Sequence, residues 1–154
     1  MKNATMKTRQ CLVSTFFPLF LICTDVALQS LINAFRGESA LGLRAINILD
    51  DSDRIFASSV FVQLETLPKA IYQQQQTEQD FYQAFFNIVH HWSIDLLTIL
   101  PNAQTIASRY GIAGMDAIHI AAAIAIGAEE FVTTEKSTKP MFRVTELQMI
   151  SIAN

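Results

Sequence analysis

The chain has 154 residues, of which 51% are hydrophobic and 16% are charged, and its formal net charge is -3. This length and apolar content suit one compact domain with a single core, and they exclude a disordered, solvated chain. The negative charge also excludes nucleic-acid binding by phosphate neutralisation alone. A nucleic-acid substrate therefore has to be held through a bridging metal ion and a local basic rim.

Residues 1–15 are expected to be a flexible leader, and residues 16–154 a single domain. The apolar run Cys11–Cys23 imitates a secretory signal because basic residues precede it. The run is too short to span a bilayer, which takes about 20 residues. We therefore expect a buried first strand at Leu19–Cys23. Two cysteines make neither a disulfide scaffold nor a four-ligand zinc site, so we expect reduced, buried thiols.

Helix-like and strand-like segments alternate after this strand. Apolar spacing and capping residues predict a first helix at Val26–Phe35, with Asp25 as its N-cap and Gly37 at its end. A second helix, capped by Ser39, carries apolar residues from Leu41 to Leu49, and a later one, capped by Thr77, extends through Trp92. Further helices are predicted at Val60–Ile71, Ala103–Tyr110 and Gly114–Ile126. Short apolar runs predict strands at Arg54–Ala57, Ile94–Leu100, Phe131–Thr133 and, at the sheet edge, Leu147–Ile152. This alternation predicts an α/β fold, a three-layer α/β/α sandwich with a central, mostly parallel sheet.

Two of these helices carry apolar stripes at helical spacing. The first stripe consists of Val60, Leu64, Leu67 and Ile71. The second consists of Phe81, Phe85, Phe86, Ile88, Val89 and Trp92. We expect the second stripe in the core, although its aromatic density would also suit a dimer or partner contact.

Four carboxylates, Asp25, Glu65, Asp116 and Glu135, sit at junctions between apolar runs and helix-like segments. In an open α/β sheet such junctions meet at one edge, so the four side chains can converge. Clustered carboxylates repel one another and titrate as a unit unless a cation lies between them. Mg²⁺ or Mn²⁺ would relieve this repulsion and could activate a water for phosphodiester hydrolysis.

The strongest local signal is the segment Gly114–Ala123 together with Phe131–Lys136. In the first segment, Asp116 opens a helix whose alanines allow it to lie close against a sheet. In the second, a strand delivers Glu135 to the same edge. Two acids from neighbouring elements can then share one cation.

Each of these residues also has a purely structural interpretation. Asp116 could be a helix N-cap, Glu65 could pair with Lys69 at i+4, and Glu135 could be a turn residue. His119 lies on nearly the same helix face as Asp116 and could be a ligand or a base. Because magnesium sites prefer oxygen, we expect His119 to be a buried, hydrogen-bonded structural residue.

Hydroxyl and basic side chains surround the second segment. Thr133 and Thr134 could orient a metal-bound water or a phosphate. Lys136, Lys139 and Arg143 form the only basic group beside a predicted acid, and they could bind substrate phosphate or belong to a solvated loop.

The segments Asp116–Ala121 and Gly127–Lys136 resemble the C-terminal half of PIN-domain ribonucleases, including VapC-type toxins. The resemblance extends upstream through Ala57–Val60 and Leu64-Glu65 and covers roughly residues 19–135. It implies that Asp25, Glu65, Asp116 and Glu135 are the catalytic, metal-binding acids of such an enzyme. The reaction implied is metal-dependent cleavage of RNA to a 5′-phosphate and a 3′-hydroxyl.

Position 25 departs from the family pattern, which usually follows this aspartate with Thr or Ser. Here the chain reads Asp25-Val26-Ala27, and another alignment places Thr24 or Ala27 at the aspartate position. A PIN fold that has lost activity and serves as a binding module is therefore the alternative function.

The resemblance also implies a cytoplasmic toxin with a small antitoxin partner. We expect a homodimer that binds RNA and no membrane. Thr133, Thr134, Lys136 and Arg143 are the expected substrate contacts. The helix surface around Phe81 and Phe85 is the expected landing area of the antitoxin.

Overall fold

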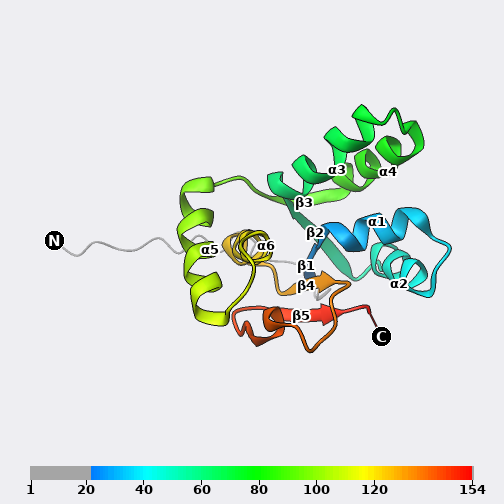
Figure 1. Cartoon of the computed structure of the whole chain (residues 1–154). Coiled ribbons are helices and arrows are strands. Elements are labelled where there is room, and N and C mark those ends of the chain that lie inside the picture. Colours follow the sequence, from blue (N-terminus) through cyan, green and yellow to red (C-terminus); the bar gives the residue numbers. More distant parts are fainter. Residues whose placement is uncertain (1–21, 154) are drawn as a thin grey trace, which may run out of the picture.

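The computed structural model describes residues 22–153 (Figure 1). The expected leader and the run before Ile22 lie outside the described residues. Five strands form one sheet in the order β3-β2-β1-β4-β5, and every neighbouring pair is parallel. The strands are β1 Ile22–Val26, β2 Arg54–Ser59, β3 Val89–Ser93, β4 Glu130–Thr133 and β5 Gln148–Ser151.

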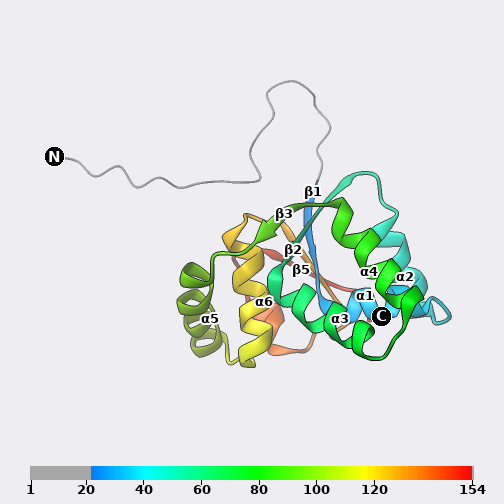
Figure 2. The ribbon, with the colours of Figure 1, turned by 90° about the horizontal axis from the view of Figure 1, so that it is seen from above.

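Helices cover both faces of this sheet, as Figures 1 and 2 show. The helices are α1 Leu28–Arg36, α2 Ala40–Leu49, α3 Val60–Tyr72, α4 Gln76–Ile88, α5 Leu96–Tyr110 and α6 Gly114–Ala125, followed by a 3-10 turn at Pro140–Arg143. The first four pack on one face, and α5 and α6 pack on the other. The predicted three-layer α/β/α sandwich is thereby confirmed. None of the helices within residues 22–153 is long and apolar enough to cross a bilayer.

The two faces are packed with side chains of different size. Toward α5 and α6, Cys23, Ala57 and Phe131 meet the buried alanines of α6. Toward α1–α4, Val26 and Phe56 meet larger side chains, among them Leu31, Tyr82 and Phe85. Small side chains on α6 let this helix lie close to the sheet, which fixes the position of its first turn.

Strand β1 lies at the centre of the sheet and extends further along the chain than the sequence predicted. Asp25 pairs in register with Ala57 of β2 and Phe131 of β4, so it belongs to the strand. Its predicted role as the N-cap of α1 is wrong. The N-cap is Ala27, whose N–H donates to the carbonyl of Val132 at 2.9 Å and continues the ladder.

The segment around β3 also differs from the prediction. Helix α4 ends at Ile88, and β3 pairs with the end of β2, although a helix through Trp92 was predicted. The predicted strand Ile94–Leu100 is the start of α5 instead. Asp95 caps this helix by accepting hydrogen bonds from the N–H and the hydroxyl of Thr98, at 3.4 and 2.6 Å.

Other helix ends are mostly as predicted. Gly37 ends α1 with a φ of 62°, and the side chain of Ser39 accepts a hydrogen bond from Gly42 N at the start of α2. Thr77 was predicted to cap α4, but the N-cap is Gln75 and Thr77 lies inside the first turn.

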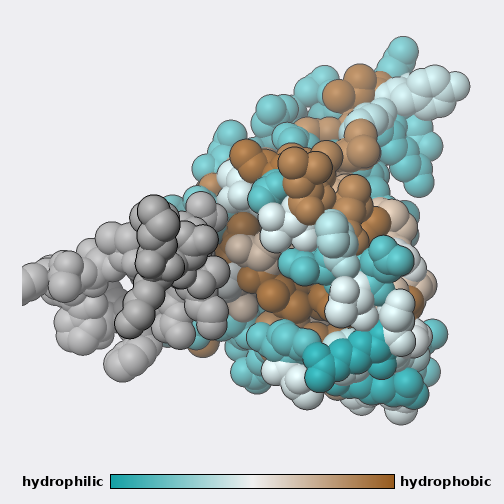
Figure 3. Space-filling model, turned by 90° about the vertical axis from the view of Figure 1, so that its left-hand side faces the viewer, coloured by the Kyte–Doolittle hydropathy of each residue, from teal (hydrophilic) through white to brown (hydrophobic). Residues whose placement is uncertain are grey.

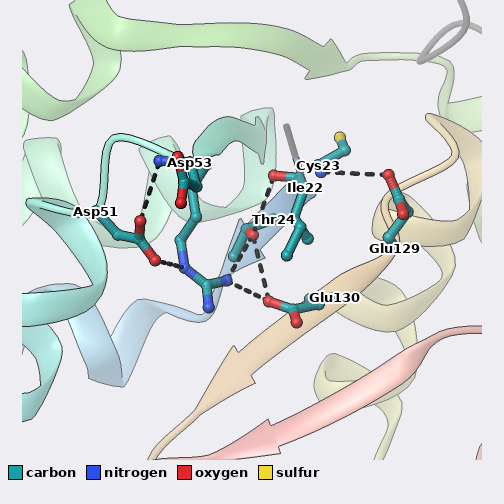
Figure 4. A network of polar contacts seen from close by, with 8 residues as sticks. Ile22, Cys23, Thr24, Asp51, Asp53, Glu129 and Glu130 are labelled. Atoms are coloured by element: carbon teal, nitrogen blue, oxygen red, sulfur yellow. Dashed lines mark hydrogen bonds and ion pairs between the residues drawn. The ribbon is translucent and has the colours of Figure 1, made fainter. Parts of the chain in front are cut away.

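A buried polar network joins three strands where each begins (Figure 4). The Arg54 guanidinium on β2 pairs with Glu130 on β4 and with Asp51 at 2.9 Å, and it donates to the Thr24 hydroxyl on β1 at 2.9 Å. The side chains of Arg54 and Glu130 are only 12% and 10% exposed. The network therefore fixes the alignment of β1, β2 and β4 at the edge opposite the predicted acids.

Helix α3 turns some of its larger apolar side chains to solvent, while Phe61 and Leu67 pack against the core. The side that faces the core carries Val62, Thr66 and Ala70, whereas Leu64 and Ile71 are exposed. Because Val62, Thr66 and Ala70 are small, α3 can pack closely on the layer below it.

Candidate functional site

The carboxyl ends of β1 and β4 meet at the point where the strand order reverses. Strands β2 and β3 lie on one side of β1, and β4 and β5 lie on the other. Open parallel sheets bind ligands at such a reversal, because the connections leaving the two strands diverge and open a crevice. Asp25 near the end of β1 and Thr133 at the end of β4 bring polar side chains to this point.

A cavity of about 230 Å³ opens at this reversal. Its walls come from α1, α3, α6, β4 and the loops that follow β1 and β4: Ala27, Leu28, Gln29, Glu65, Met115, Asp116, His119, Phe131, Thr133, Glu135 and Met141. The structure thus brings Glu65, Asp116 and Glu135 together from three separate elements. Gln29 is a lining residue that the sequence did not single out, since a lone exposed amide in a helix carries no pattern.

Asp116 lies in the first turn of α6 and not at its cap. The N-cap is Ala113, which makes no side-chain hydrogen bond. The carboxylate of Asp116 therefore stays available to the cavity, near the positive end of the helix dipole.

The pKa of Asp116 is raised above its ordinary value. Partial burial is the main cause, and the negative charges of Glu135 and Glu65 act in the same direction, while His119 and Lys139 lower it. This is the electrostatic signature of carboxylates that share a site. A cation in the cavity would reverse it.

Glu65 reaches back from α3 to His119 on α6. The Oε2 atom of Glu65 lies 2.9 Å from Nε2 of His119, and the histidine is buried. The expectation of a buried, hydrogen-bonded His119 is therefore confirmed. The alternative pairing of Glu65 with Lys69 is not made, because the carboxylate is directed to the histidine.

Glu135 is held by its backbone at the end of β4. Its N–H donates to the Thr133 hydroxyl at 3.1 Å, and its carbonyl accepts from the Ser151 hydroxyl at 2.7 Å. The side chain lies 3.9 Å from the Lys139 ammonium group. The loop is fixed on both sides, so the Glu135 carboxylate stays near the cavity.

Asp25 is placed differently from the other three acids. Its side chain is 2% exposed and does not line the cavity. The cavity is lined instead by Phe131, which pairs with Asp25 across β1 and β4. Burial raises the pKa of Asp25 to about 7, against the opposing effect of a hydrogen bond from the Val26 N–H. Among the described residues, no group donates a hydrogen bond to its Oδ1 atom.

These donors suit a hard divalent cation. Mg²⁺ and Mn²⁺ prefer carboxylate oxygens as ligands. A bound cation would lower the raised pKa of Asp116, and it would give the Oδ1 atom of Asp25 a partner. Within residues 22–153, no group of three or more His, Cys, Asp or Glu side chains stands ready to enclose an ion. The carboxylates thus share an edge of the sheet rather than a preformed coordination sphere.

Sequence comparisons find nothing similar: no protein-family model matches the chain, and no curated protein sequence does. Solved structures match it over most of its length. A chain in the VapBC2 structure from Rickettsia felis, bound to a DNA fragment from the promoter, has a TM-score of 0.64 at 16% identity and covers 84% of this chain and 98% of that one. A toxin–antitoxin complex from Klebsiella pneumoniae gives a TM-score of 0.62 at 16% identity, covering 85% and 97%.

The chain has a PIN-like fold. The resemblance inferred from Asp116–Ala121 and Gly127–Lys136 is thereby confirmed at the level of architecture. At 16% identity the likeness concerns the fold, so the role of each side chain in this PIN-like protein has to be argued from its own site.

One basic residue of the PIN-like domain, Lys139, lies beside the acidic cavity. A neighbouring hollow of about 210 Å³ shares Asp116 and Glu135 with it and is lined by Lys139 as well. Lys136 is exposed, and Arg143 is exposed with Nη1 donating to the Tyr110 carbonyl at 3.4 Å. Lys139 therefore places positive charge on one side of the acids.

Proposed function

We propose that this protein is a metal-dependent ribonuclease and the toxin of a toxin–antitoxin pair. The observation that carries the proposal is that Glu65, Asp116 and Glu135 line one cavity at the strand reversal of a PIN-like fold. Such a cavity repels the phosphates of RNA unless a cation is bound there. With a cation, the same acids suit phosphodiester hydrolysis.

In this proposal Asp25, Glu65, Asp116 and Glu135 hold Mg²⁺ or Mn²⁺. A bound ion would supply the activation of a water and the neutralisation of phosphate charge. His119 keeps Glu65 directed across the cavity through its 2.9 Å hydrogen bond. Thr133 orders the loop that carries Glu135.

The basic rim gives the proposal its substrate contacts. Lys136 and Arg143 are exposed and meet the phosphates on either side of the cleaved bond. Thr133 or Thr134 orients the attacking water or a phosphate oxygen.

The proposed partner is a small antitoxin protein, and the proposed toxin is a cytoplasmic homodimer. Support comes from the two solved structures with this fold, since both are toxin–antitoxin assemblies. The expected antitoxin landing area on α4 is wrong. Phe85 is buried against Phe56 and Phe86, and Phe81 packs against Phe35 and Tyr82, so these rings are occupied by the core.

The test is Asp116→Asn, which keeps the shape of the side chain and removes its charge. Purified wild type is expected to cleave RNA with Mn²⁺ or Mg²⁺ and to lose cleavage with a chelator. The variant is expected to lose roughly 100-fold or more of this activity. Its thermal melting without metal should be at or above that of wild type, because the repulsion from Glu135 is relieved.

Asp50→Asn is the matched control, since Asp50 is an exposed residue at the end of α2, on the opposite face of the sheet from α6. It is expected to cleave RNA like wild type. Full activity in Asp116→Asn would remove this carboxylate from the mechanism.

A PIN-like binding module without nuclease activity is the second candidate. It is favoured by the position of Asp25, whose carboxyl group is buried and does not line the cavity. Metal titration separates the two functions. A nuclease gains thermal stability with Mn²⁺, whereas a binding module melts at the same temperature with and without it.

A further inference from the structure

A second hollow lies directly beside the acidic cavity and has a volume of about 210 Å³. The two spaces share Asp116 and Glu135, so these carboxylates form their common border. An RNA chain cleaved at the acids continues on both sides of the cleaved bond, and each neighbouring nucleotide needs a place on the protein surface. The second hollow adjoins the acids and offers such a place.

Two short segments bound the second hollow. One is the turn from α5 to α6, residues 111–113, and the other is the segment 139–141. A Cβ atom at Gly111 would meet no other atom within 4 Å, so the hollow is open at this end. Apart from the two shared acids, Lys139 is the one charged residue that lines the hollow.

Side-chain contacts fix the two bounding segments relative to each other. The Tyr110 hydroxyl donates to Oε2 of Glu146 at 2.9 Å, and Nη1 of Arg109 lies 3.3 Å from Oε1 of the same carboxylate. These contacts join the end of α5 to the stretch before β5, while Met141 is buried in the core. Figure 3 shows the side of the molecule that carries α5, with mainly hydrophilic side chains along its lower edge. The width of the hollow is therefore set by the fold.

The size and lining of the second hollow suit one nucleotide of a longer chain. Pockets that enclose a whole small-molecule ligand start at about 300 Å³, so this hollow takes only a part of its ligand. Ala113, Pro140 and Met141 offer apolar contacts to the flat face of a nucleobase. A base is uncharged, so it can lie next to the two acids without repulsion.

Lys139 is placed to contact the phosphate of this nucleotide. Its ammonium group lies 3.9 Å from Oε2 of Glu135, and the two side chains are 59% and 48% exposed. A contact of this length between exposed groups is weak, so Lys139 is not committed to Glu135. A cation that binds Glu135 leaves the ammonium group free for a phosphate oxygen.

We infer that the second hollow binds the nucleotide next to the cleaved phosphodiester, with its base between residues 111–113 and 139–141 and its phosphate at Lys139. The inference rests on the proposed function for the position of the cleaved bond. Ala113 and Met141 then limit which bases fit, and Lys139 contributes to affinity through charge.

Ala113→Leu tests the base-binding part of the inference. Ala113 is exposed and makes no side-chain hydrogen bond as the N-cap of α6, and Leu is as poor a cap as Ala, so the helix is unaffected. The larger side chain extends into the hollow. With saturating Mn²⁺ and a fluorescent oligoribonucleotide, KM is expected to rise about 10-fold or more at unchanged kcat. Ala113→Ser leaves the hollow open and is expected to keep the wild-type KM.

Lys139→Met tests the phosphate contact, because it removes the charge and keeps an unbranched side chain. KM is expected to rise, and the slope of log KM against log salt concentration is expected to fall by about 0.7, as for the loss of one phosphate contact to single-stranded RNA. A purely structural role of Lys139 would leave this slope unchanged. Lys69→Met is the matched control, because Lys69 is exposed on α3 and lines neither space.

An NMR titration of the full chain with the four nucleoside 5′-monophosphates in Mg²⁺ is independent of cleavage. The amide signals of Gly111 and Ala113 are expected to shift in wild type, and the shifts are expected to disappear in Ala113→Leu. A chain that shows these shifts but cleaves no RNA would support the subsite and refute the nuclease. Signals that stay unshifted with all four nucleotides, or an unchanged KM in Ala113→Leu, would overturn the inference.

Discussion

Replacing Asp25 by Asn removes a carboxyl group that the fold holds in an unfavourable place. The pKa of Asp25 is about 7 in the folded chain because the group is buried, whereas the ordinary value is 3.8. Raising the pKa of Asp25 from 3.8 to about 7 corresponds to roughly 4 kcal/mol of lost stability once the group is ionised. Asn fills the same space without this charge.

The direction in which the free energy of unfolding changes with pH follows from the linkage between folding and protonation of Asp25. Below pH 3.8 the carboxyl is protonated in both the folded and the unfolded chain, so it costs nothing. As the pH rises from about 4 to 7, the unfolded chain releases the proton more readily, and the folded state loses stability relative to it. Above pH 7 the loss is complete. The variant therefore gains most at pH 8 and least at pH 4.

Urea denaturation with a chelator, for wild type and Asp25→Asn at each pH, measures the difference. The contributions of the other titrating groups to the free energy of unfolding cancel in this difference, because both proteins carry them. The expected difference in unfolding free energy grows with pH toward roughly 4 kcal/mol. Mn²⁺ should stabilise wild type more than the variant, because Asp25 is one of the proposed ligands of the ion.

Two profiles that run parallel from pH 4 to 8 would refute this reasoning, since they would mean that Asp25 has an ordinary pKa. Asp50→Asn, an exposed change of the same kind, is expected to give such parallel profiles.

Two further predictions concern stability. Gly42→Ala should destabilise the protein by about 1–3 kcal/mol in urea denaturation, because its Cβ would lie 2.8 Å from the backbone oxygen of Asn33; Gly114→Ala, with open space around it, should not. Glu130→Ala should cost about 3 kcal/mol by removing one of the two carboxylates that pair with the largely buried Arg54 guanidinium. The double change Arg54→Met with Glu130→Leu should recover much of that loss in the same assay, and a double variant as unstable as Glu130→Ala would contradict it.

The second half of the fold and of the site was predictable from sequence, because its signals agree with one another. Gly114–Ala123 combines helical spacing with small residues, and Phe131–Thr133 is a short apolar run that begins four positions after Gly127. Local pattern and tertiary packing therefore require the same elements. Asp116 and Glu135 were placed on the correct edge for this reason.

The segments Val89–Ser93 and Leu96–Leu100 were predicted wrongly, because short apolar runs suit a helix and a strand equally well. Val89–Ser93 is a strand because it pairs with β2. Leu96–Leu100 is helical because Asp95 caps the helix and Ile99 packs in the core. Neither interaction is visible in a local window of sequence.

Two features of the site depend on tertiary structure alone. The hydrogen bond between Glu65 and His119 joins α3 and α6, which lie far apart in the chain. Asp25 is deeply buried because β1 is the central strand of the sheet. The order of the strands in a sheet cannot be read from local sequence. The same holds for Leu64, which local spacing cannot assign to the core or to the surface.

The strand order β3-β2-β1-β4-β5 divides the proposed site between the two halves of the chain. Asp25 and Glu65 come from the half before the exposed Ile94, and Asp116 and Glu135 come from the half after it. The halves are joined side by side through the pairing of β1 with β4. A chain cut at Ile94 would therefore yield two fragments, neither of which contains all four acids. Only reassembly of the two fragments would restore the acidic cavity, which is the arrangement that a split reporter uses.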